Sequence, residues 1–104
     1  MHARISLYKI RTGKQEEFQQ SIESLKPTMR QQKGFCGLVV LRGSEISEEE
    51  TTVISIWDSL EDLRGSEKNL FFYQAMARTL TLCEGFPAVI REHEVLATEF
   101  AAKH

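Results

Sequence analysis

The sequence has no cluster of Lys and Arg residues, no long apolar run and no cysteine motif. Its 104 residues carry 13 basic and 15 acidic side chains, a formal net charge of −2, so nucleic acid is not an expected partner. Its apolar runs are short, whereas a helix that spans a bilayer needs about 20 apolar residues. The start of the chain, Met1–Arg4, leads into a strand-like pattern instead of an apolar signal core. We therefore expect no export signal and no membrane partner.

Sites for bound groups are equally scarce. The two cysteines, Cys36 and Cys83, lie far apart and belong to no CxxC pair or ligand cluster. We expect them to be free thiols in a reducing cytoplasm, and a disulfide is the less favoured alternative. The sequence contains no phosphate loop, dinucleotide fingerprint, metal-ligand spacing or nucleophile elbow. We therefore expect no metal and no cofactor.

Two short segments are rich in β-branched and aromatic residues and are bounded by turn-forming residues. These segments are 38–41 (Leu-Val-Val-Leu) and 53–57 (Val-Ile-Ser-Ile-Trp), and their composition is typical of strands. Because successive side chains of a strand point to opposite faces, both faces of these strands must be apolar. The helices of so short a chain cover only one face of a sheet. We therefore predict that a second copy of the chain covers the other face, in a homodimer.

The rest of the chain alternates between strand and helix patterns and predicts one domain over residues 1–104. We expect strands at residues 3–10, 35–43, 52–58 and 88–100, with helical segments between residues 12 and 34 and between residues 59 and 82. With right-handed crossovers, this order predicts an α+β, ferredoxin-like β-α-β-β-α-β sandwich. Its four-stranded antiparallel sheet has the order 4-1-3-2, with both helices on one face. The last strand is long, which suggests that it reaches beyond its own sheet to a partner.

Local signals mark the ends of the helices. Thr12 is expected to open the first helix in a capping box, and Pro27 should kink that helix or end its regular part. Ser59 predicts the start of the second helical segment, Ser66 is a candidate cap for a further helix, and Gly85 is a plausible stop. An apolar stripe at helical spacing runs along the first helix: Phe18, Ile22, Leu25 and Met29.

An acidic stretch separates the second and third predicted strands. Residues 44–51 include four glutamates, which raises the question of a metal site. The stretch lacks the Asp, Asn and Gly spacing of a metal-binding loop. A solvated hairpin tip is the better interpretation.

One stretch of the sequence resembles the antibiotic biosynthesis monooxygenase (ABM) superfamily. It comprises residues 52–63 (Thr-Val-Ile-Ser-Ile-Trp-Asp-Ser-Leu-Glu-Asp-Leu), the aromatic helix that follows and the strand that begins at residues 87–91 (Pro-Ala-Val-Ile-Arg). The Gly13-Lys14 turn and residues 34–37 (Gly-Phe-Cys-Gly) fit the same pattern, so the resemblance covers nearly the whole chain. It implies a dimeric α/β barrel, in which two ferredoxin-like sheets pack face to face. Each subunit would keep a pocket between its sheet and its helices.

The same resemblance implies two alternative functions. Some members are cofactor-independent monooxygenases that act on small aromatic substrates such as phenols and quinols, and others have no known reaction. This chain is therefore expected to be such a monooxygenase, or else a non-catalytic dimeric module that binds a small ligand or regulates. The family also includes a haem-degrading branch, which uses an Asn on the first strand and a Trp and a His on the second helical segment. That branch is disfavoured here, because the first strand has no Asn and residues 59–82 contain neither Trp nor His.

Two residues of the last strand are candidates for catalysis. Arg91 and His93 share one face of that strand. Tyr8 is expected across from them, because the last strand pairs with the first. A neutral imidazole could accept a phenol proton and a guanidinium could stabilise the resulting anion. The alternative is a hydrogen bond at the sheet edge or at a dimer interface.

A second set of residues could bind a flat aromatic substrate. Neighbouring residues of a helix point about 100° apart, so the three consecutive aromatics at 71–73 cannot all face the core. A place in the core or in an interface is the alternative for each member of this set. The candidate substrate-binding residues are Tyr8, Trp57, Phe71, Phe72, Tyr73 and Met76.

Overall fold

The computed structural model describes residues 1–43, 50–85 and 89–101. The elements in chain order are β1 (His2–Lys9), α1 (Gln15–Arg30), β2 (Phe35–Arg42), β3 (Glu50–Trp57), α2 (Leu60–Ser66), α3 (Leu70–Leu80) and β4 (Val89–Glu94). The four strands form one antiparallel sheet in the order β2-β3-β1-β4. This is the predicted order 4-1-3-2 read from the other edge, so the ferredoxin-like topology is confirmed.

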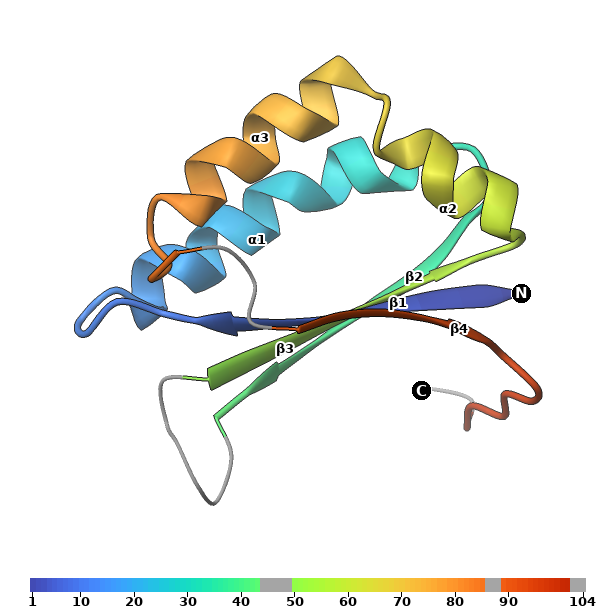
Figure 1. Ribbon diagram of the computed structural model, residues 1–104, viewed down its shortest axis with the longest axis horizontal. Coiled ribbons are helices and arrows are strands. Elements are labelled where there is room, and N and C mark those ends of the chain that lie inside the picture. The colour runs from blue at the N-terminus through green and yellow to red at the C-terminus, as the bar shows by residue number, and fades with distance from the viewer. Residues whose placement is uncertain (44–49, 86–88, 102–104) are drawn as a thin grey trace.

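All three helices lie on one face of the sheet (Figure 1). The predicted apolar stripe of α1, residues 18–29, is buried against that face. One cluster of the core forms around Tyr8, Ile10 and Phe18, and a second joins Met29, Trp57 and Leu63. Among the described residues, no helix is both long and apolar enough to cross a membrane.

The helix ends confirm some of the local signals and correct others. Ser59 caps α2, and its hydroxyl accepts the backbone N–H of Asp62 at 3.0 Å, as predicted. The first helix has Lys14 as its cap instead of Thr12, and it continues past Pro27 to Arg30. Of the two outcomes predicted for Pro27, an end of the helix is therefore wrong, and a kink stays a prediction.

The α2–α3 junction also differs from the prediction. The cap of α3 is Asn69, whose side chain accepts the backbone N–H of Phe72 at 3.0 Å. Ser66 is instead the last residue of α2, and its hydroxyl donates to the carbonyl of Leu63 at 2.6 Å. Asn69 offers the better cap because its backbone is extended, whereas Ser66 is still helical. At its other end α3 stops at Leu80, before the predicted stop at residue 85.

The last strand is shorter than expected, because β4 ends at Glu94 and residues 95–101 form no regular structure. Its ladder partner β1 begins at His2, opposite Glu94. One more backbone hydrogen bond joins the Val95 N–H to the Met1 carbonyl at 2.9 Å.

A glycine forms the turn between α1 and β2. Gly34 has φ +77°, and a Cβ at this position would overlap the carboxyl group of Asp62. Its carbonyl also accepts the backbone N–H of Asp58 at 2.8 Å. The close approach of the turn to α2 therefore requires glycine at this position.

The sheet is apolar on the face away from the helices as well. The pairing register places Val39 of β2, Ile54 of β3 and Ile5 of β1 in one row across that face. Val39 and Leu41 remain 40% and 49% exposed. The prediction of two apolar faces is confirmed. Most of the acidic stretch, residues 44–49, lies outside the described residues, whereas Glu50 and Thr51 belong to β3.

Candidate functional site

A cavity of about 660 Å³ lies between the sheet and the helix layer. Strands β1 and β3 provide its floor, and α1 and α3 provide much of its wall, because the helices pack over the buried sheet face. Its lining is largely apolar, which suits a hydrophobic ligand. Apolar residues that contribute to it include Leu25, Met29, Leu38, Val53, Trp57, Phe72 and Met76.

Most of the predicted substrate-binding residues do line this cavity. Tyr8, Trp57, Phe72, Tyr73 and Met76 all contribute to the wall, although they come from three separate elements. Tyr73 is 66% exposed, so it lies toward the opening. Phe71 is 77% exposed and is not part of the lining. The helix turns its side chain away from the sheet, and the prediction for Phe71 is not supported.

Trp57 is the most firmly held part of the wall. Its side chain is 2% exposed, and its indole Nε1–H donates to the Ser55 hydroxyl at 3.0 Å. The Phe35 ring meets it edge-on, with ring centroids 5.4 Å apart. Trp57 therefore belongs both to the core and to the cavity wall, so the two roles considered for it coexist.

Tyr8 brings a buried hydroxyl to the same cavity. It is 7% exposed, and its ring centroid lies 6.1 Å from that of Phe18. Burial raises the pKa of Tyr8, and this effect outweighs the opposite effect of its hydrogen bond with Ser6. The phenol of Tyr8 therefore keeps its proton at neutral pH and can serve as a hydrogen-bond donor.

The structure also places a charged residue in the cavity wall that the sequence patterns did not identify. Arg4, two and four residues before Ser6 and Tyr8, lies on the same strand face and lines the cavity with Glu67 and Glu92. Its Nη2 forms an ion pair with Glu67, and Glu92 is its register partner on β4. Burial lowers the pKa of Arg4, while Glu92 acts in the opposite direction. Strand alternation was the signal that could have placed Arg4 beside Tyr8.

The two predicted catalytic residues lie elsewhere. Arg91 pairs with Ile5 and His93 pairs with Ala3 in the β1–β4 register. Directly opposed residues of an antiparallel pair share a face, so both side chains lie on the face away from the helices. The expectation that Tyr8 lies across from them is wrong, and neither residue lines the cavity. The single subunit therefore gives no geometric support to their predicted roles as base and anion stabiliser.

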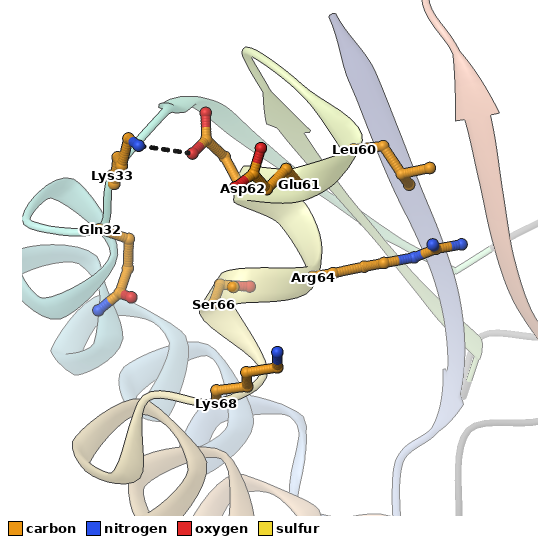
Figure 2. Close-up of a pocket in the computed structure, with 9 residues that line it drawn as sticks. Gln32, Lys33, Leu60, Glu61, Asp62, Arg64, Ser66 and Lys68 are labelled. Carbon is orange, nitrogen blue, oxygen red and sulfur yellow. Dashed lines mark ion pairs between the residues drawn. The ribbon is translucent and has the colours of Figure 1, made fainter.

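A second, more polar pocket surrounds α2 (Figure 2). It is lined mainly by charged side chains of both signs, and Figure 2 shows Lys33 and Asp62 pointing toward one another from facing segments. Their N···O distance is 4.0 Å, and the Lys33 side chain is 89% exposed. An exposed ion pair of this kind is weak. This pocket lacks the apolar enclosure of the sheet–helix cavity and is the poorer candidate for a ligand site.

The described residues that line the cavity include no cluster of metal ligands. Within residues 1–43, 50–85 and 89–101, no group of three or more His, Cys, Asp or Glu side chains is arranged to hold a metal ion. The functional groups that line the cavity are one guanidinium, two carboxylates, several hydroxyl groups and aromatic rings.

The fold and the cavity define a ferredoxin-like domain with a largely apolar cavity between its two layers. The family model of the antibiotic biosynthesis monooxygenases (ABM) matches residues 1–78. The chain belongs to this family, as the resemblance implied. No curated protein matches it in sequence.

Solved structures share the fold at low sequence identity. A candidate antibiotic biosynthesis monooxygenase from Bordetella bronchiseptica is 11% identical, with a TM-score of 0.81, over 92% of this chain and 97% of that one. Another candidate monooxygenase of this kind, from Caulobacter crescentus, is 20% identical, with a TM-score of 0.80, over 92% and 90% of the two chains. A variant of SnoaB, a cofactor-independent oxygenase from Streptomyces nogalater, is 13% identical, with a TM-score of 0.78, over 93% and 94%.

Proposed function

We propose that this protein is a cofactor-independent monooxygenase that acts on a small aromatic, phenol- or quinol-like substrate. The observation that carries this proposal is the apolar cavity of about 660 Å³ walled by Trp57, Phe72 and Met76 in a chain of the ABM family. A flat ring can pack against these side chains, and Tyr8 can donate a hydrogen bond to an oxygen on its edge. The similarity to SnoaB, itself a cofactor-independent oxygenase, favours the same class of reaction.

The proposed reaction needs no outside reductant. In the simplest case a phenol and O₂ give a para-quinone and water. One oxygen atom forms a new C=O bond at the ring, and the other leaves as water with two hydrogen atoms of the substrate. The conversion of phenol to quinone supplies the four electrons that O₂ requires, so atoms and electrons balance. The role of the protein is to hold the electron-rich ring against the apolar wall of the cavity.

A specific observation favours the second candidate function, a non-catalytic binding module. None of the described residues that line the cavity is a histidine, so the side chain most often used as a general base near neutral pH is lacking there. A module of this kind would bind the same aromatic ligands without turnover.

Oxygen consumption separates the two candidates. Purified, chelator-treated protein should consume O₂ with at least one member of a panel of quinols, naphthols and polyphenols, and the same compounds should raise the melting temperature. Trp57→Phe should weaken binding, because it removes part of the cavity wall. The matched control is Gln74→Ala, on the exposed part of α3 and outside the cavity lining. Ligand-induced stabilisation without oxygen uptake would favour the binding module, and the absence of both effects would refute the proposal.

We also propose that the protein forms a homodimer through the sheet face that the helices leave open. Support comes from the apolar row of Val39, Ile54 and Ile5 and from residues 95–101, which carry the exposed side chains Leu96 and Phe100. This segment curves toward the open face of the sheet (Figure 1). Covering these apolar groups with a second copy would remove them from water.

We further propose a cytoplasmic location. The exposed Cys36 and the buried Cys83 are both free thiols, which is the state that a reducing compartment maintains.

A further inference from the structure

The Arg4 side chain combines an ion pair with a buried N–H group that has no hydrogen-bond partner among the described residues. Its Nη2 contacts Glu67 at the end of α2, while its Nε is buried and has no hydrogen-bond partner among the described residues. A buried N–H group that lacks an acceptor is unfavourable, and such groups are usually satisfied in native proteins. Because Arg4 lines the cavity, an oxygen atom of a bound ligand could supply the missing acceptor.

The charges around Arg4 differ in their exposure to water. The Arg4 side chain is 21% exposed and the Glu67 side chain 49% exposed, and Glu92 is also exposed. Water screens the two carboxylates more strongly than it screens the guanidinium. Arg4 is therefore the least exposed of these three charges, and a guanidinium keeps its positive charge at any physiological pH.

We propose that Arg4 is a specificity-determining residue that binds the ionised hydroxyl oxygen of the aromatic ligand. This inference rests on the proposed ligand cavity and names the group that the cavity recognises. The unpartnered Nε–H of Arg4 matches a single phenolate oxygen, and the Tyr8 hydroxyl lies on the same strand face to assist. The ring itself then lies toward Trp57 and Phe72. In this arrangement the protein favours the phenolate form, which is also the form that gives up an electron to O₂ more readily.

The preference for a phenolate can be measured with a matched pair of probes, 4-nitro-1-naphthol and its methyl ether. The naphthol changes its visible spectrum when it ionises, whereas the ether cannot ionise. In the complex with the wild-type protein, the acid dissociation constant of the naphthol should be at least about tenfold larger than in the complex with Arg4→Met. The affinity for the ether should be nearly the same in both proteins. The ether therefore controls for the shape of the cavity and for the fold.

Two further variants sharpen the test. Arg4→Lys keeps a positive charge but lacks the Nε–H donor, so the naphthol should ionise to an intermediate extent. Glu67→Gln removes the carboxylate that competes for the guanidinium, so ionisation should increase above the wild-type value. Should Arg4→Met fail to fold, Arg4→Lys and Glu67→Gln still carry the test.

The outcomes distinguish the two proposals. If wild-type protein binds neither probe, the proposed ligand cavity fails. If both probes bind but the ionisation of the naphthol is unchanged in the Arg4 and Glu67 variants, the cavity stands and the role assigned to Arg4 is refuted.

Discussion

Ile54→Lys places a charge at the centre of the open sheet face. Ile54 lies in β3 between Val39 on one neighbouring strand and Ile5 on the other. In a twofold-symmetric dimer the same residue occurs in both copies, so the change acts twice. Even if the lysine side chain bends toward water, the lost apolar contact and the desolvation of its charge should cost about 2 kcal/mol in each subunit. The total of about 4 kcal/mol corresponds to a roughly thousandfold weaker dimer.

Sedimentation over a range of concentrations measures this change. The wild-type protein should sediment as a dimer at micromolar concentration, and Ile54→Lys should sediment near the 11.9 kDa of one chain. The helical signal in circular dichroism should survive, because Ile54 is only partly buried in the single subunit and points away from the helices. Gln74→Lys on exposed α3 adds the same charge outside the interface and should leave the dimer intact. A wild-type monomer, or an Ile54→Lys dimer of wild-type affinity, would refute the reasoning.

Three further predictions concern the backbone, alkaline pH and the exposed thiol. Gly34→Ala should lower the free energy of unfolding by at least about 1 kcal/mol more than Gly13→Ala. Both glycines have positive φ but only Gly34 faces a clash, so equal losses in denaturant titrations would contradict this. Burial raises the pKa of Tyr8 above its usual 10.0, so the unfolded chain loses that proton first. The stability that this protonated phenol contributes below pH 10 should therefore be lost as the pH rises further. If the melting temperature of Tyr8→Phe fell with pH as steeply as that of the wild-type protein, this reasoning would be wrong. The hydrogen bond from Cys36 to Asp58 raises the pKa of that thiol. Asp58→Asn should therefore speed its reaction with a thiol reagent at mildly alkaline pH, and an unchanged rate would disprove the effect.

The topology could be predicted from sequence because it depends on local periodicity. The spacing of Phe18, Ile22 and Leu25 and the capping by Ser59 involve residues within a few turns of one another, and both features appear in the structure. The two-faced apolar strands are likewise visible in the alternation of residues along each strand. Competing caps a few residues apart, such as Ser66 and Asn69, could not be ranked without the backbone conformation of each.

The candidate site was harder to predict because it depends on register. Alternation shows that Arg91 and His93 share a face, but only the pairing of β4 with β1 decides whether that face meets the helices. If the pairing of β4 with β1 shifted by one residue, Arg91 and His93 would face the helices and Glu92 would face away from them. The Arg4–Glu67 ion pair joins β1 to the end of α2, a tertiary contact that leaves no periodic signal in the sequence.

The most direct test of the central claim is where an aromatic ligand binds. Trp57 is the only tryptophan of the chain, and its buried indole N–H gives one resolved signal in a ¹H–¹⁵N NMR spectrum. Titration with 1-naphthol should shift this signal and the backbone signals of Tyr8 and Phe72, while those of Val39 and Ile54 on the open sheet face remain in place. Shifts confined to the open face, or no shift at saturating ligand, would contradict a ligand cavity between the sheet and the helices.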